Sequence, residues 1–186
     1  DALRALTERL GRTPPMRYLT SAHPDLVLRA MEEGRPYPIR ALVVQATNPL
    51  LTYGDTARVQ RALAALDLLV VLEYRLTPTA QLADYVLPIA GALERPVLQV
   101  HGGIANAAYG GPAAVAPYYE RRCDYDVFRE LGRRLGQAEF WPEETLEDAF
   151  ASQLLPAGLS WEEFCIEGTY WPRPAYAKHE GLGADG

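Results

Sequence analysis

The sequence predicts an α/β fold in which a mostly parallel β-sheet lies between helical layers, with additional helices near the C-terminus. Residues 41–44 and 68–72 are continuous apolar runs, a pattern typical of parallel strands buried on both faces. Between them, residues 58–66 carry apolar side chains at helical spacing, and Asp55 or Thr56 is suited to cap the helix. These three segments form a βαβ unit, and such sheets hold ligands at the carboxyl ends of their strands.

The segments before the first strand are predicted to be helical and then extended. Residues 2–10 form a first helix, and residues 24–33 form a second one, which begins at Pro24 and stops at Gly34. Residues 35–38 lead extended into the strand, because a residue that precedes proline avoids the helical region.

The second half of the chain is predicted to begin with a strand and a long loop. Residues 97–101 have strand character, whereas residues 105–117 are rich in small residues, Gly and Pro. The clearest helix of this half covers residues 124–135, with Asp124 as its N-cap and Gly136 at its end.

Two further helices and an extended tail complete the predicted elements. Residues 142–155 carry apolar side chains on one helical face. Ser160 and Glu163 have the spacing of a capping box, which predicts a short helix that Gly168 ends. Residues 170–174 are expected to be extended.

Composition and motifs restrict the classes of function. With 186 residues, of which 48% are hydrophobic and 23% charged, the chain can form one folded domain. A net charge of -6 with interspersed Arg residues argues against nucleic acid as a partner. No apolar run approaches the roughly 20 residues of a membrane span, so direct membrane insertion is not expected.

Metal ligands and catalytic residues are not predicted. Cys123 and Cys165 belong to no Cys-x-x-Cys spacing, and the three His residues are scattered, so neither an iron–sulfur cluster nor a zinc site is supported. The chain contains no Gly-x-Ser-x-Gly elbow, no His-Glu-x-x-His and no Walker lysine loop. Any chemistry would therefore come from a cofactor.

Polar residues follow both buried strands. Asn48 lies directly beyond the first strand, and Glu73 ends the second. A carboxylate at this place can accept hydrogen bonds from a guanine edge or a ribose diol, and the N–H groups of a turn can bind a pyrophosphate. The pattern indicates a nucleotide site, although Asn48 is also a common turn residue and Glu73 could be a solvated edge residue.

Five short motifs follow one another along the middle of the chain: Ala46-Thr47-Asn48-Pro49-Leu50, Leu76-Thr77-Pro78-Thr79-Ala80, Ala83-Asp84-Tyr85-Val86-Leu87-Pro88, Leu93-Glu94-Arg95, and residues 123–136. In these motifs and their order, the chain resembles the large subunits of the molybdenum or tungsten bis-pterin oxidoreductases, the dimethyl sulfoxide reductase family. Trp141-Pro142 and the following helix are similar to the polysulfide and thiosulfate reductase branch of that family.

This resemblance implies a Rossmann-like three-layer αβα fold and a division of the chain into three parts. We expect a helical lead-in over residues 1–38, a partial dinucleotide-binding α/β domain over 39–136, and a helical and extended tail over 137–186. In this family such a segment is internal, so we expect an excised piece of a longer subunit. The metal ligand and an iron–sulfur cluster would lie outside it.

The implied cofactor is molybdopterin guanine dinucleotide with molybdenum or tungsten. The implied partners are the remainder of the catalytic subunit and an electron-transfer iron–sulfur subunit. By position, the residues near the cofactor would be Asn48, Glu73, Thr79, Arg95 and Asp124.

Some of these residues also have simpler explanations. Helix capping explains Thr77 or Thr79, and it also explains Asp124. Arg95 would pair with a phosphate or with the neighbours of Glu94. The family more often has Asp at the position of Glu73.

The loop near residues 102–106 departs from the family pattern. The family's Glu-Gly pattern is absent there, which puts a pterin contact from that loop in doubt.

Two alternatives remain beside a cofactor-binding enzyme segment. The large iron–sulfur subunit of NADH dehydrogenase resembles the same family but lacks the pterin, so the fold can serve as a scaffold. Retention of Asn48 and Glu73 at the strand ends favours cofactor binding. A free-standing nucleotide-binding module is the third reading, and the lack of Gly-x-Gly-x-x-Gly after either strand argues against the nicotinamide type.

Overall fold

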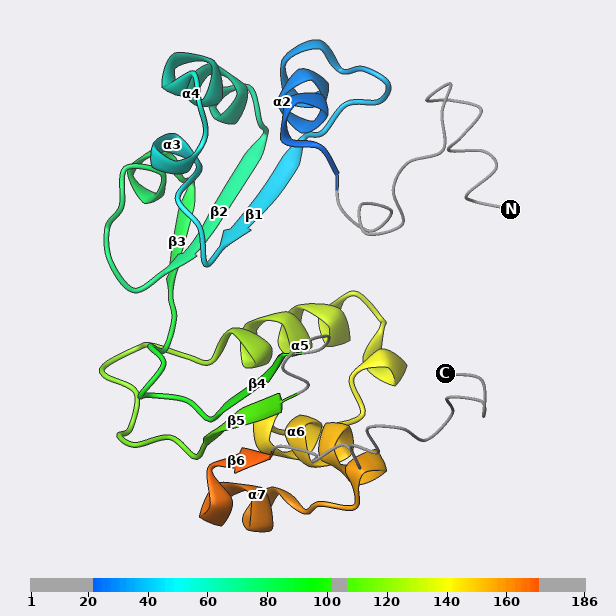
Figure 1. Ribbon diagram of the computed structural model, residues 1–186. Coiled ribbons are helices and arrows are strands. Elements are labelled where there is room, and N and C mark those ends of the chain that lie inside the picture. Colours follow the sequence, from blue (N-terminus) through cyan, green and yellow to red (C-terminus); the bar gives the residue numbers. More distant parts are fainter. Residues whose placement is uncertain (1–21, 102–106, 171–186) are drawn as a thin grey trace, which may run out of the picture. The chain divides into compact units, whose positions relative to one another are not determined.

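The computed structural model describes residues 22–101 and 107–170. The chain forms two compact units, one ending at Pro88 and the other beginning at Ile89 (Figure 1). Each unit contains its own β-sheet and is described by itself. Within the described residues, no helix has the length and apolar character needed to cross a membrane.

The first unit has the predicted parallel α/β architecture. Its sheet has the order β1-β2-β3, and both pairs of neighbouring strands are parallel. This confirms the predicted βαβ unit. The elements in chain order are α2 (Pro24–Glu33), β1 (Ala41–Gln45), α3 (Pro49–Thr52), α4 (Thr56–Ala64), β2 (Leu68–Glu73), the 3-10 helix η2 (Ala80–Leu82) and β3 (Tyr85–Pro88).

The core of the first unit lies on one face of this sheet. Val43 precedes the core residue Val44 in β1, and successive residues of a strand point to opposite faces, so Val43 faces away from the core. Tyr85 is paired with Val43 through Val70 of β2 and therefore lies on the same outer face. They are 44% and 63% exposed, so this unit supplies a helical layer on one face of the sheet. The buried core residues are Leu28, Met31, Val44, Leu50, Val59, Ala62, Leu63, Leu69, Val71 and Ala80.

The ends of the two longer helices follow from their capping residues. Helix α2 begins at Pro24 and ends at Gly34, whose left-handed backbone (φ 68°) closes the last turn, as predicted. Asp55 is the N-cap of α4, and its carboxylate accepts a hydrogen bond of 3.0 Å from the backbone N–H of Arg58. The Arg58 side chain also pairs with Asp25 and Glu32 of α2, which joins the two helices at the surface.

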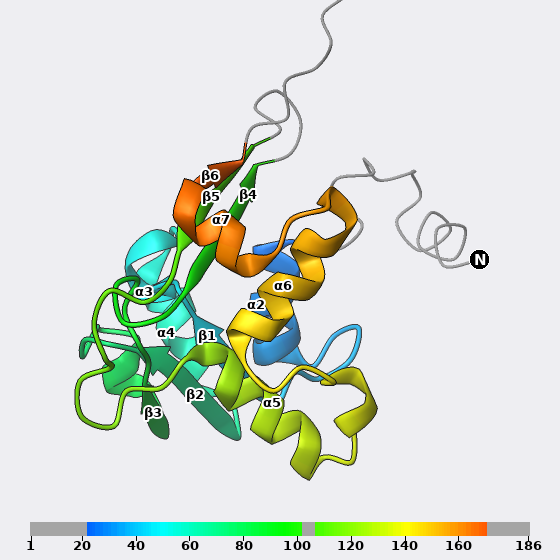
Figure 2. The ribbon, with the colours of Figure 1, turned by 90° about the horizontal axis from the view of Figure 1, so that it is seen from below.

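The second unit contains an antiparallel sheet of order β4-β5-β6 (Figure 2). Helix α7 contacts β5 and β6, and α6 packs against α7. The elements are β4 (Val97–His101), β5 (Ala107–Gly111), α5 (Asp124–Arg134), the 3-10 helix η3 (Ala138–Phe140), α6 (Leu146–Leu154), the 3-10 helix η4 (Leu155–Ala157), α7 (Trp161–Glu167) and β6 (Thr169–Tyr170).

The prediction of a loop over residues 105–117 was wrong for β5. Four of the five residues of this strand are Ala or Gly, which are depleted in strands, so pairing with β4 and β6 decides its conformation. Gly110 is needed there because a Cβ atom would lie 1.8 Å from the carbonyl oxygen of Val97. The strand character predicted for residues 97–101 is confirmed.

The helices of the second unit also correct some predicted starts. Cys123, not Asp124, is the N-cap of α5. Helix α6 begins after Thr145 rather than at residue 142, because Thr145 and Asp148 form a capping box that the sequence reading missed.

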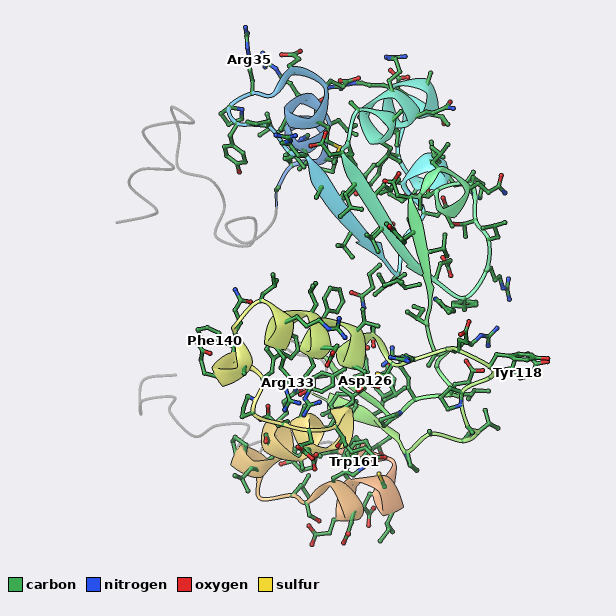
Figure 3. The ribbon with its side chains drawn as sticks, turned by 180° about the vertical axis from the view of Figure 1, so that it is seen from behind. Arg35, Tyr118, Asp126, Arg133, Phe140 and Trp161 are labelled. Carbon is green, nitrogen blue, oxygen red and sulfur yellow. The ribbon has the colours of Figure 1, made fainter. Side chains whose placement is uncertain are left out.

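Helix α7 has the predicted ends and covers a small core. Ser160 and Glu163 form its capping box, and Gly168 ends it. Phe164 is 1% exposed and lies beside Trp161, which Figure 3 labels. Ala108 and Leu154 are the other buried members of this core.

The boundary between the two units differs from the predicted domain limits at residues 38 and 136. Helix α2 shares one core with β1 and β2, so the expected lead-in belongs to the first unit. The division falls after β3, at Pro88. The helix predicted over residues 2–10, the loop over 102–106 and the tail beyond residue 170 lie outside the described residues.

Candidate functional site

The candidate site is the carboxyl edge of the parallel sheet in the first unit. Gln45 of β1 pairs with Leu72 of β2, and Glu73 is the next residue of β2. Asn48 follows three residues after Gln45, where it begins α3. The structure therefore places Asn48 and Glu73 after adjacent strands at one edge of the sheet, as the sequence predicted.

The backbone between β1 and α3 has an unusual conformation. Ala46 has a φ of 55°, in the left-handed region that residues with a Cβ rarely adopt. Such a conformation costs about 1–2 kcal/mol, and strain of this kind is concentrated at functional sites. It turns the chain sharply just before Asn48.

Thr79 connects Asn48 to the start of α3. Its side chain is completely buried, although Thr is polar. The Thr79 hydroxyl donates to Asn48 Oδ1 over 2.6 Å and accepts from the backbone N–H of Leu50 over 3.2 Å. Thr79 has no exposed surface with which to touch a ligand, so its effect on a ligand would pass through Asn48.

Glu73 and its neighbour Arg75 provide opposite charges at the end of β2. Glu73 is half-buried, and one carboxylate oxygen accepts from the backbone N–H of Tyr74 over 2.9 Å. Arg75 lies over the Tyr74 ring, with 5.4 Å from its guanidinium carbon to the ring centroid. No ion pair joins Arg75 to another described residue. The sequence reading missed this cation because nothing in the pattern distinguishes it from a solvated loop residue.

Asp84 fixes the third strand beside the second. Its carboxylate accepts from the backbone N–H of Leu69 over 2.7 Å, and its own N–H donates to the Leu69 carbonyl over 2.9 Å. These two bonds lie at the amino end of β2, just before β3 begins, so they set the register of β3 against β2 at the end of the sheet opposite the candidate site. The Ala83-Asp84 motif thus has a structural role here.

The other two predicted site residues belong to the second unit. Arg95 makes one long hydrogen bond, 3.5 Å, to the carbonyl of Pro96. Asp124 is the first residue of α5, and its carboxylate accepts from the N–H of Tyr125 over 3.1 Å. Asp124 therefore lies in the first turn of α5, where a negative charge stabilises the N-terminus of the helix.

Glu94 pairs with Arg121 rather than with Arg95. Its carboxylate accepts from Arg121 over 2.8 Å, from the N–H of Gly91 over 2.8 Å and from the N–H of Tyr118 over 3.1 Å. These bonds, led by the one from Gly91, lower the pKa of Glu94. Glu94 thus holds the loop from which Tyr118 projects (Figure 3).

The cysteines and acidic residues give no metal site in the described part of the chain. No group of three or more His, Cys, Asp or Glu side chains there has the geometry of one. Burial and the neighbouring Asp124 raise the pKa of the Cys123 thiol to about 11, which makes it unreactive.

A cavity of about 290 Å³ lies between α2 and β1. Its walls are mostly apolar and include Val27, Met31, Leu42, Val44 and Tyr53. A nucleotide's phosphates and base edges need polar partners. Gln45 and Thr47, at the carboxyl end of β1, also line the cavity, so it borders the polar strand ends that form the candidate site.

Comparison with known proteins identifies the family. A family model described as molybdopterin oxidoreductase matches residues 16–134. The solved structure of acetylene hydratase from Pelobacter acetylenicus has a TM-score of 0.77 and 36% identity, over 87% of this chain and 22% of that one.

Several curated relatives match as well. The acetylene hydratase of Syntrophotalea acetylenica is 35% identical over 87% of this chain and 22% of its own length. A formate dehydrogenase alpha subunit of Methanococcus maripaludis is 30% identical over 80% of this chain and 22% of its own length. A thiosulfate reductase subunit of Salmonella typhimurium is 30% identical over 64% of this chain and 16% of its own length.

The relatives carry out different reactions, according to their names, and their identities to this chain are similar. The thiosulfate and polysulfide reductase branch therefore stays a prediction. The chain spans 22% or less of the length of these relatives. It belongs to the molybdopterin oxidoreductase family.

Proposed function

We propose that this chain helps to bind the guanine dinucleotide arm of a molybdenum or tungsten pterin cofactor, within a larger oxidoreductase subunit. The observation that supports this most is the pair Asn48 and Glu73, which follow adjacent parallel strands at one edge of the sheet. Ligands of open α/β sheets bind outside the carboxyl ends of the strands.

The polar groups at this edge fit a guanosine nucleotide. Glu73 offers a carboxylate, which accepts from the N–H groups of a guanine edge or from a ribose diol. Asn48 offers an amide, and Arg75 adds a cation that has no ion-pair partner among the described residues. Acceptor, donor and positive charge are the three kinds of group that a base with a pyrophosphate requires.

The bound cofactor would supply the redox chemistry through its metal and pterin. The residues of this chain would bind and orient the nucleotide end. Asn48 and Glu73 would fix its position at the sheet edge. No residue of this chain is assigned a catalytic role. In the second unit, Arg95 and Asp124 stay predictions that rest on the resemblance.

The experiment uses the full-length protein that contains this chain, purified with its cofactor. Asn48→Asp keeps an oxygen for Thr79 but replaces the amide N–H donors by a negative charge. Glu73→Gln removes the charge and keeps the shape. Gln81→Glu, at an exposed position of the same unit, is the matched control for an amide-to-acid change.

We measure molybdenum and tungsten by mass spectrometry and guanine nucleotide after acid hydrolysis, per subunit. The proposal expects wild type and Gln81→Glu to retain both, and Asn48→Asp and Glu73→Gln to lose them. Full retention in both site variants would contradict it. Wild-type protein that lacks metal and guanine would instead support the pterin-free scaffold.

A further inference from the structure

We propose that Thr79 is a positioning residue that turns the Asn48 carboxamide so that its N–H groups face the nucleotide. This inference rests on the function proposed above. It assigns a role to a residue that has no surface of its own, and it specifies which kind of ligand group Asn48 meets.

A threonine hydroxyl can donate one hydrogen bond and can accept others. The Thr79 oxygen accepts from the backbone N–H of Leu50 over 3.2 Å. Its own hydrogen is then free to donate, and Asn48 Oδ1 lies 2.6 Å away. The three groups form a chain in which Leu50 donates to Thr79 and Thr79 donates to Asn48.

The opposite orientation of the Asn48 amide is unfavourable. It would place the amide nitrogen, which only donates, against the Thr79 oxygen. The Thr79 hydrogen would then lose Asn48 Oδ1, the acceptor to which it is bonded in this structure. Because Thr79 is 0% exposed, water does not replace that acceptor. A buried donor without a partner costs about 1–3 kcal/mol, so Oδ1 faces Thr79.

The consequence concerns the other end of the amide. Asn48 is half-buried, and no described residue accepts a hydrogen bond from its Nδ2. With Oδ1 held by Thr79, Nδ2 is directed away from it, and its N–H groups are the part of Asn48 that a ligand meets. The ligand atom at this point must therefore be a hydrogen-bond acceptor of the guanine dinucleotide.

The test again uses the full-length protein with its cofactor and follows the rate at which guanine nucleotide and metal are lost during incubation. Thr79→Val has the same shape but no hydroxyl, so the amide is free to rotate. Thr79→Ser restores the hydroxyl. Val59→Ala, which removes volume from the same core at a fully buried residue, controls for a general loss of stability. Thermal unfolding is recorded for each variant.

Thr79→Val is expected to lose cofactor about tenfold faster than wild type, the factor that one typical hydrogen bond provides. Thr79→Ser is expected to stay within about threefold of wild type, and Val59→Ala is expected to unfold at a lower temperature without faster cofactor loss. Equal loss from Val59→Ala and Thr79→Val would overturn the positioning role, as would a wild-type rate for Thr79→Val.

The Asn48→Asp variant separates the two proposals. If it loses cofactor while Thr79→Val retains it, Asn48 contacts the cofactor but Thr79 does not position it. If both retain cofactor, the function proposed for Asn48 fails together with the role of Thr79.

Discussion

Asp84 is the residue whose replacement tests the register of β3 against β2 most simply. Its carboxylate accepts a 2.7 Å hydrogen bond from the backbone N–H of Leu69, and Leu69 is only 2% exposed. In Asp84→Ala this N–H loses its acceptor. A hydrogen bond to a charged group contributes about 1.5–3 kcal/mol, and the low end applies because the Asp84 side chain is exposed.

A loss of about 1.5 kcal/mol corresponds to a local opening equilibrium that is roughly tenfold more populated. Hydrogen–deuterium exchange of the peptide over residues 67–73 in the full-length protein measures this directly. Asp84→Ala is expected to exchange about tenfold faster than wild type. Asp84→Asn keeps an acceptor without charge, so we expect its exchange to be about threefold faster than wild type.

Asp67→Ala is the matched control at the same end of β2, because Asp67 is exposed and its carboxylate pairs with the exposed Arg40. Exposed pairs contribute about 0–1 kcal/mol, so exchange in this variant is expected to stay near the wild-type rate. If Asp84→Ala exchanges no faster than Asp67→Ala, the Asp84 bonds do not hold β3 in register and the reasoning fails.

Three further predictions concern the second unit. Phe164→Ala is expected to lower the free energy of unfolding by about 3–5 kcal/mol, because the Phe164 side chain is 1% exposed. Ile166→Ala, at a side chain that is 83% exposed, should stay near wild type in denaturant unfolding. Equal effects of the two substitutions would contradict the assignment of Phe164 to the core. The Cys123 thiol, with a pKa of about 11, is expected to resist alkylation up to about pH 9, and rapid labelling at pH 8 would contradict this. Because the fold favours the neutral thiol, its contribution to stability is expected to fall as pH rises from about 9 to 11. Glu94 has a lowered pKa, so its contribution to stability is present above the ordinary Glu pKa and is lost as pH falls through the lowered value. Hydrogen–deuterium exchange in residues 112–121, corrected for its intrinsic pH dependence, should rise as this happens, and Glu94→Gln should show the same rise already at neutral pH. Unchanged protection in Glu94→Gln would mean that Glu94 does not anchor the loop.

The parallel unit was predictable because its signals are local. Apolar runs give β1 and β2, and the ends of α2 follow from Pro24 and Gly34, whose backbone preferences act without help from distant residues. The capping box of α7 is equally local. Polar residues at the strand ends could also be found, since the topology of a βαβ unit brings them to one edge.

The antiparallel unit was predictable only in part because its signals are tertiary. Strand β5 has weak intrinsic preference, and the clash that a Cβ at Gly110 would make with Val97 becomes visible only once the strands pair. At the site, the sequence indicated Thr79 as a ligand candidate, whereas the structure shows that its hydroxyl bonds to residues about 30 positions earlier. The periodic pattern of apolar residues in a sequence does not reveal a hydrogen bond between residues so far apart. The partners of Glu94 were missed for the same reason.

A structure of the full-length protein with its cofactor bound tests the account most directly. We expect Asn48 Nδ2 to lie about 3 Å from a hydrogen-bond acceptor of the guanine dinucleotide, with Thr79 still bonded to Oδ1 and Glu73 at the guanosine end. A cofactor bound away from the β1–β2 edge, with neither Asn48 nor Glu73 in contact, would contradict the account.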